Sequence, residues 1–176
     1  MDVDQTPAIQ ARRNLSAFEH LYQKWLNPVY RYFRYRVNSE KEAEDLTSQV
    51  FLKIYEQLPN YIERGQFPAW LFTIVRHQIA DYFRADKPVL PLEDLNLRAD
   101  GTNLLEHTTR TDDLTRLSQL IRALPETELE LIRLRFVAQL TYKDIAVILG
   151  STREGVRKQI VRLLARLQDQ MEEDHA

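Results

Sequence analysis

The chain has no cysteine and only four glycines among its 176 residues. Without cysteine it can form neither a disulfide framework nor a thiolate metal site, so nothing marks an oxidising compartment and a Cys-rich zinc module is excluded. Four glycines are too few for a turn-dense all-β chain or a glycine-rich phosphate-binding loop. These shortages favour a mostly helical protein, and we expect it in the cytoplasm.

Long apolar runs and catalytic signatures are missing as well. No stretch approaches about 18 uncharged apolar residues, and the N-terminus lacks a basic segment followed by an apolar run, so we expect neither secretion nor a membrane partner. The sequence contains no G-x-x-x-x-G-K-[ST], H-E-x-x-H or G-x-S-x-G, and its four histidines are scattered without ligand spacing. We therefore expect no enzyme, no catalytic residue, no metal site and no cofactor.

The charge is nearly balanced overall but not locally. The 24 Lys and Arg residues against 26 Asp and Glu residues give a formal charge of −2. Over residues 153–166, however, five bases face one acid, Glu154, and acids gather at the C-terminal end. A near-neutral chain with one short basic stretch indicates a local contact with an anionic partner such as nucleic acid.

Apolar residues recur in steps of three and four from Leu15 to Phe33, which predicts an amphipathic helix. Pro28 lies inside this stretch. Because proline removes a backbone hydrogen bond and clashes with the preceding turn, we expect either two helices meeting near Asn27 or a bend there.

Two further helices are predicted in the first half of the chain. One covers residues 43–58, with Ser39 as its N-cap and Pro59 as its stop. The other covers residues 70–83 after Pro68, which suits a first helical turn because its missing N–H has no partner there. Together the three helices could close one hydrophobic core.

The periodicity lapses from Asp86 to Asp113, where prolines and turn residues are frequent, and we interpret this stretch as a flexible linker. Its leucines are too many for a purely solvated tether, so we expect part of it to dock on another surface. These leucines are Leu90, Leu92, Leu95, Leu97, Leu104 and Leu105.

The second half contains several helix signals. A stripe from Leu114 to Leu124 ends at Pro125, and Thr127 with Glu130 has the T-x-x-E spacing of a capping box before the next apolar run. We expect a second helix that begins at this box and carries the apolar residues from Leu131 to Phe136.

A helix-turn-helix follows. Thr141 and Asp144 open a short helix that ends at Gly150, which suits a left-handed C-cap, and a longer helix runs from Arg153 to about Gln168. Two short capped helices separated by three residues are typical of this DNA-binding motif.

The longer helix has the chemistry of a recognition helix. Its apolar positions should face inward, which leaves a polar set facing outward: Arg153, Glu154, Arg157 and Lys158. Arginine can pair with guanine in the major groove, glutamate can accept from cytosine, and further bases can neutralise phosphate. The alternative is that a basic outer face only keeps an amphipathic helix solvated.

Aromatic side chains are more numerous in the first half than a small core requires. Tyr61, Phe67 and Phe72 lie close in sequence to a group of cations and to His77, and aromatics interleaved with cations can stack unpaired bases while holding phosphates. The alternative is that these rings belong to the core.

The order of these parts resembles a known family. The segments AEDLTSQVF at 43–51 and FPAWLFTIVRHQIADYFR at 67–84, after the helix at 18–37, are similar to region 2 of bacterial sigma factors. The segment LIRALP at 120–125 with the helix-turn-helix at 140–167 is similar to region 4. With only a linker between the blocks, the layout is that of the extracytoplasmic-function (ECF) group.

The resemblance implies an all-α protein of two small helical domains, a region 2 domain at 13–86 and a region 4 domain at 113–170. They would be joined by a linker at 87–112 and flanked by an N-terminal tail at 1–12 and an acidic tail at 171–176. It also implies a transcription initiation factor that binds core RNA polymerase, through its clamp helices and flap, and promoter DNA. An anti-sigma factor is a further possible partner.

Residue roles follow from the same resemblance. The clamp contact falls on Asp45, Leu46 and Gln49. Recognition of the minus-ten element and strand opening fall on the loop at 60–66 and on positions of the helix that follows it. The residues assigned are Asn60, Tyr61 and Arg64 in the loop and Arg76, His77, Ala80 and Arg84 in the helix, with Asp81 beside them.

Recognition of the minus-thirty-five element falls on Arg153, Glu154, Arg157 and Lys158, with Arg162 on phosphate. Four leucines lie in the part that packs on the flap in the family, although a place in the domain core is the favoured interpretation: Leu120, Leu124, Leu131 and Leu134.

A different class of function competes with this one. A stand-alone helix-turn-helix regulator, with the first block as a dimerisation or sensing domain, would bind duplex DNA tightly without polymerase. Five clustered bases predict a salt slope of only about −4.5, which is modest for independent specific binding.

Overall fold

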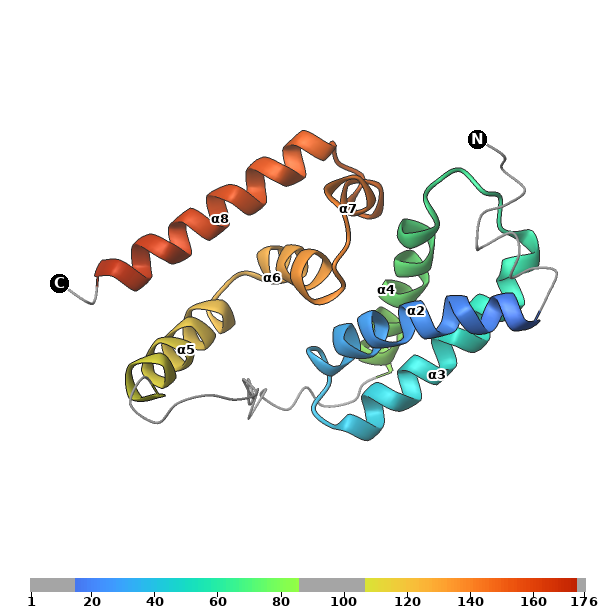
Figure 1. Ribbon diagram of the computed structural model, residues 1–176, viewed down its shortest axis with the longest axis horizontal. Helices are drawn as coiled ribbons and strands as arrows, with labels where there is room; N and C mark the ends of the chain where they lie inside the picture. The colour runs from blue at the N-terminus through green and yellow to red at the C-terminus, as the bar shows by residue number, and fades with distance from the viewer. Residues whose placement is uncertain (1–14, 86–106, 174–176) are drawn as a thin grey trace.

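The computed structural model describes residues 15–85 and 107–173, and all regular structure in these two ranges is helical. The helices form two groups, α2 to α4 and α5 to α8, as Figure 1 shows. This arrangement confirms the predicted all-α fold. Within the described ranges, no helix is both long enough and apolar enough to span a bilayer.

The first helix, α2 (Leu15–Arg34), continues through Pro28 as one element. The alternative of two helices meeting near Asn27 is therefore wrong. Buried side chains lie on both sides of the proline, Leu21 before it and Val29 and Phe33 after it. Packing of this continuous stripe offsets the loss of one backbone hydrogen bond.

The next two helices begin where the sequence predicts. Helix α3 (Glu40–Gln57) starts after Ser39, whose side chain accepts a hydrogen bond from the Glu42 backbone N–H, and a short 3₁₀ turn, η2 (Leu58–Asn60), follows it. Helix α4 (Phe67–Arg84) carries its proline in the first turn. Ser39 thus satisfies one of the unpaired N–H groups at the start of α3.

The core of the first group is aromatic. Tyr32 and Phe72 are fully buried with ring centroids 5.7 Å apart, Tyr61 packs on Trp70, and Phe67 is 9% exposed. The hypothesis that Tyr61, Phe67 and Phe72 stack unpaired bases is contradicted, because their rings are enclosed by other side chains. These rings are core residues, as the alternative held.

The second group contains α5 (His107–Arg122), α6 (Glu126–Ile132), a π-helical turn η3 (Arg133–Val137), α7 (Tyr142–Leu149) and α8 (Arg153–Glu173). Helix α5 begins within the segment predicted as linker, and α8 runs five residues past its predicted end, into the predicted acidic tail. Polar turns at helix ends carry no apolar period, so the pattern could not reveal them.

The start of α6 differs from the prediction. The helix follows Pro125 with no side-chain cap, and the T-x-x-E box of Thr127 and Glu130 does not form. Glu130 is buried instead and bonds to side chains of the first group. A tertiary partner outweighs the local capping interaction here.

The π-helical turn changes the direction of the chain before α7. The Ala138 N–H donates to the carbonyl of Arg133, and Gln139 has a φ of 57°. A left-handed residue ends the turn, and the N–H of Leu140 then donates to the carbonyl of Leu134.

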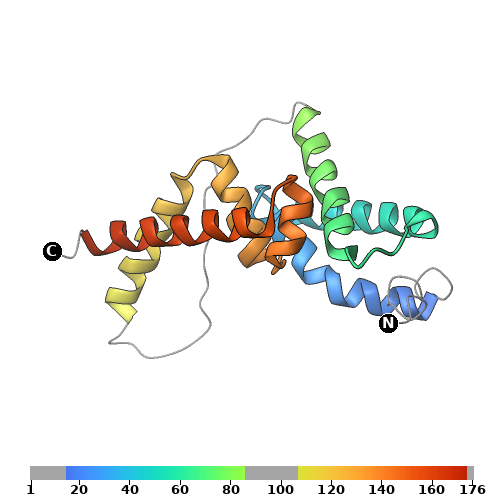
Figure 2. The same cartoon turned by 90° about the horizontal axis from the view of Figure 1, so that it is seen from above.

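The two groups pack on each other. Helix α4 contacts α7 and helix α2 contacts η3, and the view of Figure 2 shows α7 lying against the first group. Buried residues of both groups belong to one hydrophobic cluster. The predicted docking of leucines at 90–105 lies outside the described residues.

Candidate nucleic-acid interface

The helix-turn-helix is built from local signals that the sequence carries. Thr141 accepts from the Asp144 N–H at 3.2 Å while the Asp144 carboxylate accepts from the Thr141 N–H, which completes a capping box. Gly150 ends α7 with a φ of 62°, and the N–H of Ser151 donates to the carbonyl of Ala146. Both predicted caps are confirmed, and they set the start of α8 relative to α7.

Helix α8 has the predicted inner and outer faces. Its apolar positions are buried, with Val156 0% and Ile160 1% exposed. Four polar side chains of the first two turns are exposed: Arg153, Glu154, Arg157 and Lys158. A helix that presents such a set from its N-terminal turns has the geometry of a recognition helix.

Two of these side chains form one unit. The Arg157 guanidinium donates from Nε and Nη2 to the two carboxylate oxygens of Glu154 at 3.0 and 2.7 Å. This hydrogen bonding lowers the pKa of Glu154 and raises that of Arg157, so both remain charged. The readout surface therefore presents an ordered acceptor and donor side by side.

Arg162 takes a different position from the other predicted readout residues. It is exposed, but it lines a cavity of about 650 Å³ together with Gln159 and Arg166 of the same helix. The cavity lies between α8, α6 and the first group. Arg162 therefore lies at this cavity, one turn or more beyond the four readout residues along α8.

The predicted residues of α4 lie along its surface at spacings of three and four. His77 and Arg84 are exposed, Ala80 is partly buried, and Arg84 pairs with Asp81 at 3.2 Å. Arg76 is turned toward the second group and bonds to Glu130. His77 and Arg84 thus reach the surface, and Ala80 reaches it in part. The Arg76 side chain is 36% exposed and is also engaged within the molecule.

The loop before α4 is anchored by its aromatic residue. The Tyr61 side chain is 6% exposed and donates to Glu63, whose carboxylate also accepts from the Gly65 N–H. Burial together with Glu63 raises the pKa of Tyr61 to about 12. Asn60 and Arg64 are exposed on this loop.

The same loop exposes an apolar side chain that the sequence analysis did not single out. Ile62 is 67% exposed, more than the other exposed large apolar residues in the described part of the chain. An isoleucine between polar loop residues gives no periodic signal, so only the structure could reveal its position.

The three residues predicted to contact the polymerase clamp line a groove of about 290 Å³ between α3 and α4. Asp45 and Gln49 are exposed, whereas Leu46 is only 4% exposed and belongs to the core. The wall from α4 contributes Gln78, Asp81 and Tyr82. The groove is therefore acidic at its rim.

Hydrogen bonds hold the walls of this groove in place. Lys53 donates to the Gln78 side chain at 2.6 Å, and Gln78 donates to Gln49 at 2.6 Å. Tyr82 donates to Glu42 at 2.5 Å, and burial with this hydrogen bond raises its pKa to about 12. The surface around Asp45 is thus preorganised.

Glu130 is a charged residue whose position the sequence analysis missed. Its carboxylate accepts from Tyr32 and from Arg36 and Arg76, all in the first group, and its side chain is 8% exposed. Burial and Glu130 raise the pKa of Tyr32 above its ordinary value. The available sequence signal, a glutamate three residues after a threonine, indicated a cap instead.

The leucines assigned either to the flap or to the core divide by burial. Leu131 and Leu134 are 6% and 0% exposed and belong to the core, whereas Leu120 and Leu124 are partly exposed.

In residues 15–85 and 107–173, no group of three histidine or acidic side chains is placed to hold a metal ion.

Two family models match the chain, one for each group of helices. The family described as Sigma-70 region 2 matches residues 21–88, and the family described as Sigma-70, region 4 matches residues 114–167.

Individual relatives agree with this division. The chain is 34% identical over 161 residues to the ECF RNA polymerase sigma factor BldN of Streptomyces coelicolor, a match that covers 86% of this chain and 60% of BldN. It is also 34% identical over 152 residues to the ECF RNA polymerase sigma factor SigD of Mycobacterium tuberculosis, covering 81% of this chain and 71% of SigD.

A solved structure shares the fold. CnrH, determined in complex with the cytosolic domain of CnrY, superposes with a TM-score of 0.64 over 98% of this chain and 99% of CnrH, at 22% identity.

Proposed function

The chain belongs to the ECF sigma factors of RNA polymerase, and from this premise we propose that it recognises minus-ten and minus-thirty-five promoter elements and assists strand opening. Sigma factors are transcription initiation factors and not enzymes. The proposal divides the work between a region 2 domain at 13–86 and a region 4 domain at 113–170, and it places the protein with RNA polymerase in the cytoplasm.

The minus-thirty-five element is read by the exposed N-terminal turns of α8. Arg153, Glu154, Arg157 and Lys158 supply donors and an acceptor for base edges in the major groove, because an α-helix fits that groove with its first turns against the bases. Arg162 holds a phosphate at the edge of this surface.

The minus-ten element is contacted by α4 and the loop before it. Asn60, Arg64, His77 and Arg84 are exposed there, and Ala80 leaves room for a close approach of the strand. Arg76 contributes a cation for phosphate. The buried ring of Tyr61 does not contact DNA in this proposal and instead holds the loop in position.

Core RNA polymerase binds at the groove between α3 and α4. Asp45 and Gln49 provide a charged and a polar contact for the clamp helices, and Leu46 fixes the helix that carries them. Leu120 and Leu124 are the partly exposed residues available to the flap.

An anti-sigma factor is a further proposed partner on the strength of family membership alone.

One observation carries this proposal. A chain matched by region 2 and region 4 of the sigma-70 family also exposes four chemically suitable side chains at the start of its recognition helix. A solvated amphipathic helix does not require the bidentate Glu154–Arg157 pair or the two confirmed caps that position it.

The test is a fluorescence titration of the labelled chain with core RNA polymerase, followed by run-off transcription on a genomic fragment library. Saturable binding together with new discrete start sites is the expected result, and the start sites identify the promoter elements. Absence of polymerase binding, with a shift of duplex DNA by the protein alone, would support the stand-alone regulator instead.

A further inference from the structure

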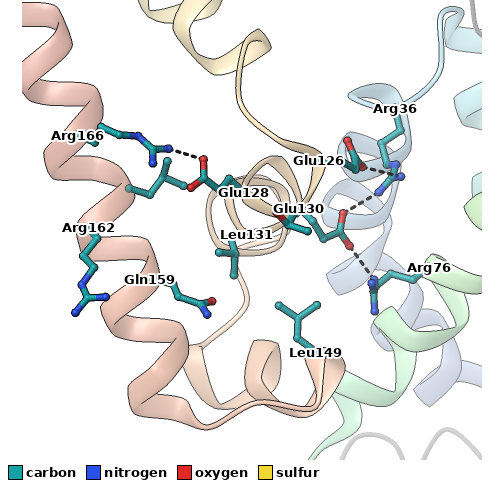
Figure 3. Close-up of a pocket in the computed structure, with 12 residues that line it drawn as sticks. Arg36, Arg76, Glu126, Glu128, Glu130, Leu131, Leu149, Gln159, Arg162 and Arg166 are labelled. Atoms are coloured by element: carbon teal, nitrogen blue, oxygen red, sulfur yellow. Dashed lines mark hydrogen bonds and ion pairs between the residues drawn. The ribbon is translucent and has the colours of Figure 1, made fainter.

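A cluster of charges joins the two groups of helices at Glu130 of α6. Arg36 Nη1 lies 2.7 Å from one carboxylate oxygen and Arg76 Nε lies 2.8 Å from the other, and the Tyr32 hydroxyl donates to both at 2.9 and 3.1 Å. Glu126, one turn earlier, pairs with Arg36 at 3.0 Å. Figure 3 shows the carboxylates of α6 reaching the two arginines.

Glu130 has charged or hydrogen-bonding partners in both groups of helices. All three donors to Glu130 come from the first group, and Arg133 of the second group lies 3.8 Å from the same carboxylate. An ionised carboxylate loses most of its hydration when its side chain is only 8% exposed, so these charged hydrogen bonds are needed to keep it there.

The surroundings indicate a contact that can open. The cavity of about 650 Å³ lies beside the cluster and is lined by charged side chains of both groups. Buried apolar residues of both groups join one hydrophobic cluster, but on the cavity side the contact is polar and incompletely filled. Polar contacts between domains of one chain resemble transient protein interfaces, and buried ion pairs add little net stability once desolvation is counted.

The contact between the two groups of helices conflicts with the proposed role of Arg76. Arg76 is assigned to DNA phosphate, but here its Nε donates to Glu130 and its Nη1 donates to the Ile148 carbonyl at 3.4 Å. Two of the five guanidinium donors are thus engaged, and the ionised carboxylate beside them repels a phosphate oxygen from this side chain, which is 36% exposed. Glu130 and phosphate therefore compete for Arg76. The readout side chains at the start of α8 remain exposed in the same arrangement.

We propose that Glu130 competes with DNA phosphate for Arg76, so that this closed arrangement withholds the Arg76 contact of the minus-ten surface while the minus-thirty-five surface stays accessible. The inference rests on the proposed role of Arg76 in minus-ten binding. Opening of the two groups releases Arg76, and phosphate then replaces the carboxylate as its partner. DNA binding and opening are therefore linked, and each favours the other.

The test uses the full chain, which has no native cysteine. Ser48→Cys on α3 and Gln168→Cys on α8, both at exposed positions, allow a donor and an acceptor dye to report the separation of the groups by energy transfer. Affinity is measured on the unlabelled chain with a fluorescent single-stranded DNA of mixed sequence.

Glu130→Gln removes the carboxylate charge, and Glu128→Gln is the matched control. Glu128 lies on the same helix and loses the same charge, but its partner is Arg166 of the second group. We expect Glu130→Gln to lower energy transfer and to raise single-strand affinity at least about fivefold over the control. Adding Arg76→Gln should remove this gain.

Several outcomes would overturn the proposal: unchanged energy transfer in Glu130→Gln, an equal gain in the Glu128→Gln control, a gain that persists without Arg76, or no single-strand binding by Glu130→Gln. Circular dichroism checks that the variants keep their helices.

A second measurement avoids substitution at Glu130. Single-stranded DNA added to the dye-labelled chain should lower energy transfer as it saturates, and constant transfer at saturation would refute competition. Failure of the sigma function would appear separately, as absence of polymerase binding, because energy transfer without DNA reports closure alone.

Discussion

At the scale of single residues, the Glu154–Arg157 pair is the best-defined feature of the candidate DNA surface. Two hydrogen bonds hold both side chains in one geometry although neither is buried. A preorganised pair loses less side-chain freedom on binding than two independent long side chains. Base recognition at this position should therefore depend on both residues together.

Replacement of Arg157 by alanine tests this readout. We expect a loss of about 1 to 3 kcal/mol in promoter discrimination with unchanged affinity for core polymerase, because one bidentate base contact disappears. The measurement compares transcription from matched and mismatched minus-thirty-five elements. Lys41→Ala, which removes an exposed cation from α3, is the control. Equal loss of discrimination in the control would mean that overall charge, and not readout, is responsible.

Asp45 tests the groove between α3 and α4. We expect Asp45→Ala to weaken binding of core polymerase by at least about 1 kcal/mol, the scale of a charged hydrogen bond at an interface, while circular dichroism stays helical. Glu44→Ala is the matched control, since Glu44 is an exposed acid one residue away and does not line the groove. Unaltered polymerase affinity in Asp45→Ala would remove the clamp assignment.

At the scale of elements, the helix-turn-helix depends on how α7 ends. Gly150 takes a left-handed conformation, and its N–H donates to carbonyls of the last turn of α7. A residue with a side chain is strained there, because its Cβ approaches the neighbouring carbonyl. The direction of α8, and with it the readout surface, follows from this one turn.

Gly150→Ala is expected to lower the free energy of unfolding by about 1 kcal/mol, measured by urea denaturation. Apart from the two neighbouring residues, no atom lies within 4 Å of the added Cβ, so the cost comes from the local backbone conformation and not from a tertiary clash. Gly150→Asn is the control, since asparagine tolerates the left-handed region, and it should lose less. An equal loss in both variants would argue against backbone strain as the cause.

At the scale of the whole molecule, ion pairs reduce the cationic surface that the sequence suggests. Of the five bases in residues 153–166, Arg157 pairs with Glu154 and Arg166 pairs with Glu128. The chain as a whole carries a formal charge of −2. A protein of this charge should depend on a larger partner for tight promoter binding.

The salt dependence of DNA binding tests whether these ion pairs reduce the number of bases available to phosphate. With three of the five bases outside these pairs, the chain alone should bind duplex DNA weakly, with a slope of log affinity against log salt of about −2.7 instead of about −4.5. Fluorescence anisotropy over a salt series measures the slope. A slope steeper than about −4.5 with tight binding would favour the stand-alone regulator.

Much of the fold could be predicted because its signals are local. The period of apolar residues, the Ser39 and Thr141 caps and the Gly150 stop involve residues at most four apart, and the structure confirms each of them. The exposed face at the start of α8 follows from the same period. The polar ends of α5 and α8 were missed because helical turns without apolar residues leave no such pattern.

By itself, then, the sequence determined most of the helices, the caps at Ser39, Thr141 and Gly150, and the family, because these depend on neighbours along the chain and on the order of segments. Only the tertiary structure decided which groups face each other. Tyr32 and Arg36 meet Glu130 across 98 and 94 positions, and no local pattern predicts that pairing. The capping box does not form because a carboxylate buried by the fold would be costly without charged donors, and these donors come from the first group.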